Sequence, residues 1–206
     1  MKKVLLTFMV VVAGLSVTAL DMNAQSTSAQ TRHQQEMAKW HQEMQEFKAR
    51  TEQRRELNEL TDSIAGVQAA AAVKNQDFVL EANSVMFKNG ATTFVNSTTN
   101  FISVKGNRAV VQISPSNFAA GPNGVGGVTV DGMITERSIT KDKRGNITYS
   151  MNVMGVGINA QVDIYMFPNS NSASATIYPN FNSNTVWIQG NIVPYENSDV
   201  IEGSSL

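Results

Sequence analysis

The spacing of apolar residues along the chain changes twice and divides it into three parts. Val4–Ala19 is an almost continuous apolar run. Between Gln30 and Lys74 apolar residues return every three or four positions, which is the period of one face of a helix. Beyond Asp77 they alternate with polar residues, which is the period of a half-buried strand. The pattern therefore predicts a leader, a helical segment and a β domain, in that order.

The leader has the features of a secretory signal peptide. The basic start Met1–Lys3 precedes the apolar run, which is short and early for a membrane span. Small residues suit cleavage after Ala19 or Ala24, and the abrupt change to polar composition favours Ala24. We therefore predict a signal peptide over residues 1–24. No second apolar run of membrane length follows, so we expect a mature protein without a transmembrane span, in the periplasm or outside the cell.

Residues 25–74 are predicted to form a helical arm, because the stretch from Gln30 lacks proline, has Gly66 as its one glycine and is rich in helix formers. Its apolar residues form two stripes, which are Met37, Trp40, Met44 and Phe47, then Leu57, Leu60, Ile64, Val67 and Ala71. The ten-residue step between the stripes breaks the heptad and predicts two helical segments that meet near Thr51–Arg55. We expect the second segment to pack on the β domain. The first is expected to be mobile or to bind a partner, and self-association is one alternative.

Residues 75–206 are predicted to form one antiparallel β domain. Ile158–Met166 alternates most clearly, and Lys105–Asn107 and Lys141–Gly145 are hairpin turn signals. The strand-like segments are residues 78–82, 92–95, 101–104, 108–113, 135–140, 146–153, 158–166, 173–178 and 186–193. Because short turns without a helical pattern separate them, we predict a mainly β fold. It would be a meander of about nine strands, closed as a barrel or folded as a sandwich.

A glycine-rich stretch, Asn117–Gly132, lies in the middle of the predicted β domain. Its turn residues predict a loop, then a short strand at Val128–Val130 and a second turn at Asp131–Gly132. The glycine spacing matches neither common phosphate-binding pattern, so we favour a wide loop and a β-bulge. The alternative is a backbone cradle for an anion or a glycan. Its candidate ligand-binding residues are Gly121, Asn123, Gly124, Gly126 and Asp131.

Composition excludes several classes of protein. The net charge of −1 provides no basic surface for a nucleic acid or an anionic membrane. The chain has no cysteine, which rules out disulfides, thiol catalysis, cysteine zinc sites and a lipid anchor on an N-terminal cysteine. Charged residues make up 16% of the chain, and asparagine, serine and threonine take their place. This composition suits an extracytoplasmic β protein.

Candidate catalytic residues are few, and we predict no catalytic centre, metal or cofactor. Both histidines, His33 and His41, fall in the helical arm about 80° apart, outside any metal-binding motif. Glu81 and Asp163 lie on the polar faces of predicted strands and could pair across a cleft, as in a glycosidase. A sugar-stacking platform is a further alternative, and its members would be Tyr149, Tyr165, Tyr178, Trp187 and Tyr195.

Five blocks of the sequence resemble those of one protein family. They are Phe78–Ala82, Phe94–Val104, Gly121–Gly132, Lys141–Asn146 and Asn180–Asn184. The family consists of exported proteins, common in Bacteroidetes, that are catalogued as a domain of unknown function. The resemblance covers roughly residues 73–206, and the signal peptide with a helical preamble is similar to the family's layout. It implies a Gram-negative envelope or extracellular location and carries over no activity, cofactor or catalytic residue.

Three functions are consistent with these patterns. We favour a non-enzymatic binding or structural module of the cell envelope, whose helical arm docks to a partner or to a second copy. The alternative is a lipocalin-like carrier, whose barrel holds a small apolar or glycan ligand. The third is a hydrolase that uses Glu81 and Asp163, and it requires their carboxyl groups to lie within about 5–10 Å of each other.

Overall fold

The computed structural model describes residues 2–114, 127–155, 159–180 and 185–203, with side chains from residue 32 onward. The chain separates into two compact units, residues 1–57 and residues 58–206. The described part of the first unit is helical. The second unit contains the last turns of the same helix, a β-barrel and a C-terminal tail. Among the described residues, no helix combines the length and the apolar composition needed to cross a membrane.

Helix α1 (Lys2–Asn75) is helical at every position, including Thr51–Arg55. The predicted break at these residues is therefore wrong. The change of phase alters which side of the helix is apolar, but it introduces no proline or glycine that would interrupt the backbone bonds. The Thr51 hydroxyl also bonds back into the helix, since it donates to the Phe47 carbonyl at 2.8 Å.

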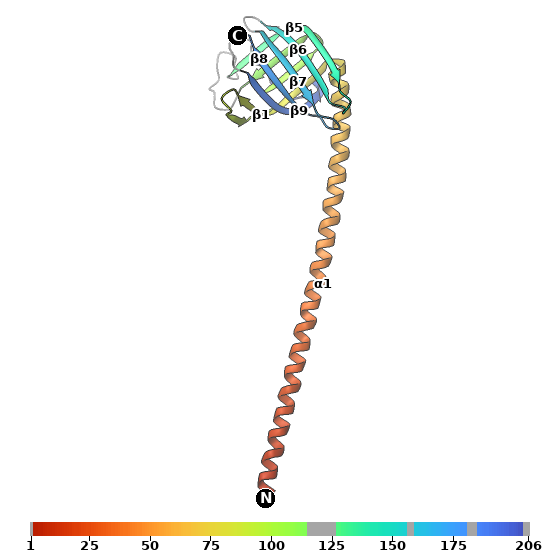
Figure 1. Ribbon diagram of the computed structural model, residues 1–206, viewed down its shortest axis with the longest axis vertical. Helices are drawn as coiled ribbons and strands as arrows, with labels where there is room; N and C mark the ends of the chain where they lie inside the picture. Colours follow the sequence, from red (N-terminus) through yellow and green to blue (C-terminus); the bar gives the residue numbers. More distant parts are fainter. Residues whose placement is uncertain (1, 115–126, 156–158, 181–184, 204–206) are drawn as a thin grey trace. The chain divides into compact units, whose positions relative to one another are not determined.

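Nine antiparallel strands follow the helix. They are β1 (Asp77–Phe87), β2 (Thr92–Phe94), β3 (Phe101–Lys105), β4 (Arg108–Ile113), β5 (Val128–Lys141), β6 (Ile147–Gly155), β7 (Asn159–Met166), β8 (Ser172–Pro179) and β9 (Val186–Pro194), before a 3-10 turn, η1 (Tyr195–Asn197). Consecutive strands pair from β3 to β9, and β1 pairs with both β3 and β9. These pairings close an eight-stranded barrel, with β2 added beside β1 (Figure 1). The prediction of a mainly β meander is confirmed. Of the two arrangements that the sequence left open, barrel and sandwich, the structure has the barrel.

Strand β1 closes the barrel because one of its edges changes partner along its length. Residues 77–81 pair with β3 and residues 84–86 pair with β2, while the other edge runs along β9. A β-bulge between Ala82 and Ser84 marks the change. The backbones of β1 and β9 approach closely here, since a Cβ at Gly190 would overlap the Glu81 carbonyl. Glycine at this position therefore permits the closure.

Strand β5 is continuous over 14 residues. The predicted turn at Asp131–Gly132 is wrong, because β5 runs through both residues. Gly132 pairs with Gly155 of β6, and a Cβ at Gly132 would collide with the backbone of Met154. This glycine thus serves the close approach of two strands rather than a turn. The predicted wide loop falls on residues 115–126, outside the described part of the chain.

The interior of the barrel is filled by apolar side chains from all eight barrel strands, with exposed fractions of 0–6%. Phe78, Leu80 and Ala82 alternate into this core, as the period of two predicts. The rings of Phe78 and Tyr149 meet edge to face, with their centroids 5.3 Å apart. The core is therefore packed by contacts between side chains that lie far apart in the sequence.

The last turns of α1 pack on the barrel through small side chains. Ala69 and Val73 belong to the core cluster, and Gly66 lies against the β7–β8 turn, where a Cβ would come within 2.8 Å of the Ser170 nitrogen. The larger apolar residues of these turns are 60–70% exposed, namely Leu60, Ile64 and Val67. At about 100° per residue, the two faces lie about 150° apart around the helix. This part of the helix packs on the β domain, but its larger apolar residues do not make the contact.

The C-terminal tail covers a second, smaller apolar cluster on the outer face of the barrel. The cluster consists of Val79, Phe101 and Val110, packed against Val193, Tyr195 and Val200. Gln112 holds the tail in place, because its Nε2 donates to the Ile201 carbonyl (2.9 Å) and its Oε1 accepts from the Gly203 amide (2.7 Å). The tail thus protects apolar surface that would otherwise face water.

Candidate functional site

The predicted ligand-binding residues fall into two groups. Four of them lie outside the described residues, namely Gly121, Asn123, Gly124 and Gly126. Asp131 lies on β5, and its two carboxylate oxygens accept from Arg108 Nε and Nη2, both at 2.9 Å. Arg108 Nη2 also donates to Glu202 at 2.9 Å, and these two carboxylates, Asp131 first, raise the pKa of Arg108. Asp131 therefore helps to anchor the C-terminal tail, and its carboxylate is engaged by an arginine.

Glu81 and Asp163 do not form a catalytic pair. Strands β8 and β9 separate their strands, which places them about 14 Å apart around the barrel at about 4.8 Å per strand. The strand registers place Asp163 level with Met86, which adds about 17 Å along the strand direction. Ser198 donates to Glu81 at 2.6 Å, so this carboxylate also contacts the tail. The geometry that the hydrolase hypothesis requires is not present.

The aromatic residues of the predicted sugar platform lie in three separate places. Tyr149 is buried in the core. Tyr195 belongs to the tail cluster, and the Lys105 ammonium lies 4.4 Å from its ring centroid. The remaining three lie on the strands β7, β8 and β9, and they are Tyr165, Tyr178 and Trp187. The platform of five residues is therefore wrong.

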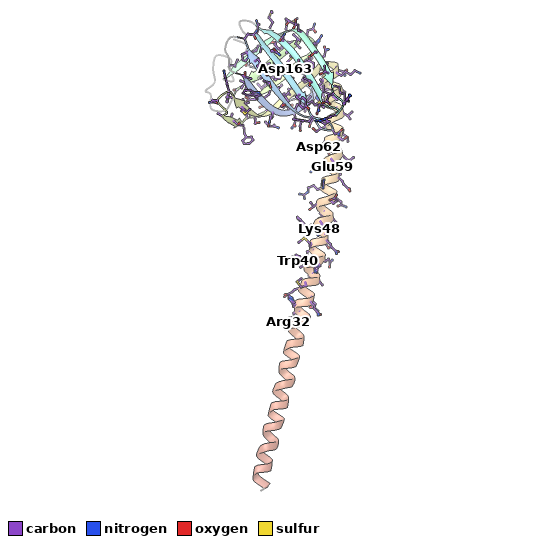
Figure 2. The ribbon with its side chains drawn as sticks, viewed as in Figure 1. Arg32, Trp40, Lys48, Glu59, Asp62 and Asp163 are labelled. Carbon is purple, nitrogen blue, oxygen red and sulfur yellow. The ribbon has the colours of Figure 1, made fainter. Side chains whose placement is uncertain are left out.

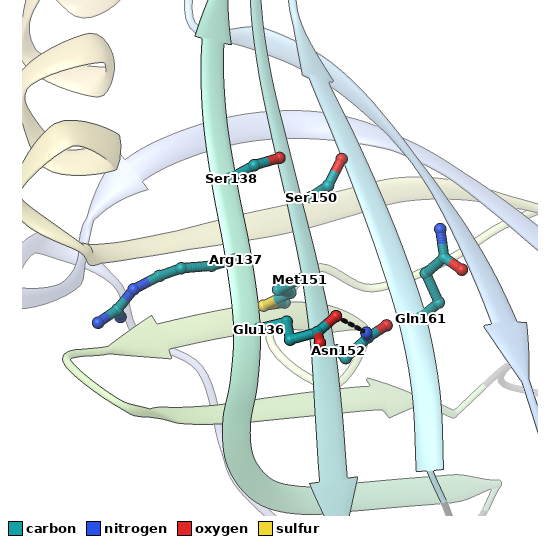
Figure 3. A pocket seen from close by; sticks show the side chains of 7 residues that line it. All are labelled: Glu136, Arg137, Ser138, Ser150, Met151, Asn152 and Gln161. Atoms are coloured by element: carbon teal, nitrogen blue, oxygen red, sulfur yellow. Dashed lines mark hydrogen bonds between the residues drawn. The ribbon is translucent and has the colours of Figure 1, made fainter.

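A polar groove of about 560 Å³ lies on the face of β5, β6 and β7 (Figure 3). It is lined by Glu136, Arg137, Ser138, Ser150, Met151, Asn152 and Gln161. The register pairs Glu136 with Asn152 and Ser138 with Ser150, so polar groups of neighbouring strands face the same side. Sequence reasoning missed this groove. Polar residues alternate in the sequences of β5 and β6 and could have indicated a polar face. Only the strand register shows that the two sets of polar side chains lie side by side.

The groove offers hydrogen bonds rather than a reactive centre. Asn152 Nδ2 donates to Glu136 at 3.0 Å, and Gln161 Nε2 donates to Asp163 at 3.2 Å. Residues 58–206, which form the unit of the groove, contain no histidine that could activate its two serines. Arg137 points away from the serines and donates to the β3–β4 turn (Figure 3). The described side chains of the groove therefore offer hydrogen-bonding groups, and its carboxylate, Glu136, is already paired with Asn152.

The histidines do not contribute to a metal site in the described part of the chain. His33 and His41 are exposed on α1, and the His41 ring lies beside the Trp40 ring, with centroids 5.0 Å apart. Within the described residues, no cluster of three or more histidine or acidic side chains could hold a metal ion.

Helix α1 carries two exposed apolar surfaces with heptad spacing. The N-terminal stripe belongs to the first unit and consists of Met37, Trp40, Met44 and Phe47. Figure 2 shows the side chain of Trp40, which is 50% exposed, on the surface of the helix. The C-terminal stripe belongs to the second unit and consists of Leu60, Ile64 and Val67. Single exposed apolar residues are ordinary, but a repeated row on one side of a helix is typical of a docking surface.

The fold and these surfaces define a small antiparallel barrel protein whose core is completed by a helix. Residues 62–192 match the family described as Domain of unknown function (DUF4251), and the chain belongs to this family. A crystal structure of a DUF4251 family protein from Bacteroides eggerthii is 46% identical, with a TM-score of 0.61, and the match covers 68% of this chain and 95% of that chain. None of the curated proteins matches the chain. The resemblance to a Bacteroidetes family of unknown function is thus confirmed.

Proposed function

We propose that the chain is a non-enzymatic binding module of the bacterial cell envelope, in which the apolar side of α1 is the docking surface. The observation that carries the proposal is the C-terminal stripe, whose members are 60–70% exposed about 150° from the helix face that contacts the barrel. Burial of one such side chain contributes about 1.5–3 kcal/mol. A partner that covers the stripe would gain this free energy without disturbing the barrel.

Two further observations support the envelope location and the non-enzymatic role. The sequence predicts a signal peptide over residues 1–24, and a relative of 46% identity comes from a Bacteroides species. The family match brings no activity with it. The carboxylates considered for catalysis lie on strands separated by two others.

A charge placed in the C-terminal stripe tests the proposal. Ile64→Asp should shift the protein from a larger assembly to the monomer in gel filtration of envelope extracts, because a carboxylate is costly to bury in an apolar interface. Asn58→Asp is the matched control, since it adds the same charge about 150° away from the stripe. Both variants should keep the thermal midpoint of the barrel, because Ile64 is 60% exposed. Identical elution of Ile64→Asp and the unchanged protein would contradict the proposal.

The closed barrel is the observation that favours a second candidate, a carrier of a small apolar or glycan ligand. Eight-stranded barrels are wide enough either to be filled by side chains or to hold one small ligand. The described inner residues belong to one contact cluster with exposed fractions of 0–6%, which weighs against a large interior site among them. Mass spectrometry of the native protein tests this candidate, since a carrier should release a co-purified lipid or glycan of one mass.

A further inference from the structure

The strand registers bring outward-facing side chains of neighbouring strands into two parallel rows on the outer face of the barrel. The first row runs from β5 to β8 and consists of Glu136, Asn152, Gln161 and Tyr178. The second row lies two residues away along the strands, runs from β5 to β9, and consists of Ser138, Ser150, Asp163, Thr176 and Trp187. Both rows face outward, since the residues that alternate with them on β7 and β8, such as Val162 and Ile177, are buried in the core. The polar groove occupies the β5–β7 end of the rows (Figure 3).

The other end of the rows carries two aromatic rings. Trp187 pairs with Thr176, which places it diagonal to Tyr178 on the next strand, at about 7–8 Å between backbones. The Tyr178 side chain is 43% exposed and Trp187 is partly exposed, so both rings contribute to the surface. Tyrosine and tryptophan combine an apolar ring with one polar atom, which suits a ligand that is apolar on its faces and polar at its edges. The ring of a sugar has this character, with C–H bonds on its faces and hydroxyl groups around its edge.

The polar members of the rows are oriented by hydrogen bonds to one another. Gln161 Nε2 donates to Asp163 at 3.2 Å, and Asn152 Nδ2 donates to Glu136 at 3.0 Å. Each amide has a second N–H and a carbonyl oxygen, and each carboxylate has further lone pairs, so both pairs retain donors and acceptors for a ligand. A carboxylate accepts strongly from a hydroxyl group. These pairs therefore present the mixture of donors and acceptors that sugar hydroxyls require.

The charges of the rows limit the choice of ligand. Glu136 and Asp163 are the charged members, and both are acidic, which disfavours a phosphate or an acidic sugar. Arg137 does not offset them, because it points away from the groove serines and donates to the β3–β4 turn. The two carboxylates lie two strands and two residues apart, or about 12 Å, which is too far to share a metal ion. A neutral ligand with several hydroxyl groups fits these constraints.

We propose that this outer face of the barrel binds a neutral oligosaccharide. Tyr178 and Trp187 stack on sugar rings, and Gln161 with Asp163, on the neighbouring strand β7, bind hydroxyl groups. Further sugar units extend over Asn152 into the groove. The site goes beyond the proposed function, because it belongs to the barrel and does not involve the apolar side of α1. It also differs from the carrier, whose ligand lies inside the barrel.

A glycan array with neutral and acidic oligosaccharides tests the ligand class. The protein, as the producing cell processes it, should bind neutral members of the array and leave the acidic members unbound, because the two carboxylates repel them. Binding to no neutral member, or equal binding to acidic members, would overturn the inference.

Titration calorimetry with the neutral oligosaccharide that binds best on the array tests the residues. Tyr178→Ala should weaken binding about tenfold, whereas Tyr178→Phe, which keeps the ring, should bind as the unchanged protein does. Gln161→Ala should also weaken binding about tenfold, because it removes a donor and an acceptor. Gln68→Ala is the matched control, since it removes the same side chain from an exposed position of α1. Tyr178 and Gln161 are exposed as well, so every variant should keep the thermal midpoint.

These experiments separate the outer face from the other sites. Unchanged affinity in both Tyr178→Ala and Gln161→Ala would place the oligosaccharide elsewhere, including the barrel interior, and would overturn the inference. Ile64→Asp should bind the oligosaccharide as the unchanged protein does, because the docking surface on α1 is a separate site. Failure on the array therefore leaves the proposed function standing, and failure of Ile64→Asp to change the assembly leaves the outer face standing.

Discussion

The buried polar residues of the barrel act mainly on the chain's own backbone. Asn100 is 0% exposed, and its amide donates to the Ser114 carbonyl (3.0 Å) and accepts from the Ser114 nitrogen (2.7 Å). Gln112, also 0% exposed, donates to the Thr99 carbonyl at 3.0 Å and bonds to the C-terminal tail. The polar side chains of the chain therefore do more than give the strands polar outer faces. Some of these side chains replace strand pairing where the backbone leaves the sheet.

Tyr149 is an exception to this rule, because its buried hydroxyl has no hydrogen-bond partner among the described residues. Burial raises the pKa of Tyr149, and the Arg137 guanidinium offsets this only in part. A buried unpaired hydroxyl costs free energy of folding, whereas the ring contact with Phe78 stabilises the core. We predict that Tyr149→Phe leaves the free energy of unfolding unchanged or raises it by about 1 kcal/mol in urea denaturation.

The control for this prediction is Tyr149→Ala, which removes the ring as well and should cost about 3–5 kcal/mol. A loss of more than about 1 kcal/mol in Tyr149→Phe would show that the hydroxyl has a partner in solution.

Asp142 organises the β5–β6 turn, and its effect on stability should depend on pH. Its carboxylate accepts from the Asn146 side chain at 2.6 Å and from the backbone nitrogens of Asn146 and Arg144 at 2.9 and 2.8 Å. These bonds, the Asn146 side chain first, lower the pKa of Asp142 below its ordinary value of 3.8. A lowered pKa in the folded state stabilises the fold above the unfolded pKa, and the contribution is lost as pH falls through the folded pKa.

We therefore predict that Asp142→Asn has a lower thermal midpoint than the unchanged protein at pH 7. The difference should shrink as the pH falls below about 4, because protonation removes the same charge from the unchanged protein. Asp62→Asn, at an exposed position of α1, is the control and should show no such convergence. A difference that stays constant from pH 7 to pH 2 would mean that the carboxylate charge is not the cause.

At the scale of elements, the sequence predicts well which strand residues alternate between buried and exposed. It predicts poorly which surfaces of the strands and of the helix contact one another. The period of two predicted from Ile158 onward appears in β7 (Asn159–Met166), because burial on one face of a strand leaves a direct trace in the sequence. Gly132 leaves no such trace, since a glycine that permits close strand approach looks like a glycine in a turn. The polar groove on β5 and β6 depends on strand register, which periodicity alone does not specify.

The helix shows the same limit of sequence reasoning. Its larger apolar residues suggest the face that packs on the barrel, yet the contact is made by Gly66, Ala69 and Val73. Small side chains let the helix approach the barrel closely, and the row of larger residues is left on the other side. Periodicity finds the apolar row but does not say which partner covers it.

Gly66 should therefore be intolerant of even one methyl group. In an isolated helix, Gly66→Ala would raise helical stability by about 1 kcal/mol. Here the added Cβ would lie 2.8 Å from the Ser170 nitrogen and 3.1 Å from a neighbouring carbonyl carbon, both backbone atoms that cannot rotate away. We predict a lower thermal midpoint and faster proteolysis near residue 66. Gln68→Ala, at an exposed position, gives the helix a better helix former without the clash and should not lower the midpoint.

At the scale of the whole chain, the two units depend on different sources of stability. The unit of residues 58–206 has a core to which the helix and all eight barrel strands contribute. In the other unit, the side chains of residues 32–57 are exposed except for the partly buried Met44. An isolated helix gains little from propensity alone in water, and most helices in proteins depend on packing of an apolar face. The first unit therefore gains little stability from packing among its own described side chains.

Two truncated chains test this division. A chain that begins at Asn58 keeps Ala69, Ala72 and Val73, so it should melt at the same temperature as the full-length protein. A chain that begins at Asp77 loses these three residues and uncovers part of the core around Phe78. It should be less stable by about 3–5 kcal/mol, at about 1.5–3 kcal/mol for the valine and less for each alanine. Circular dichroism of both chains should show mainly strand. Equal melting temperatures for the two chains would contradict the assignment of the last helical turns to the barrel core.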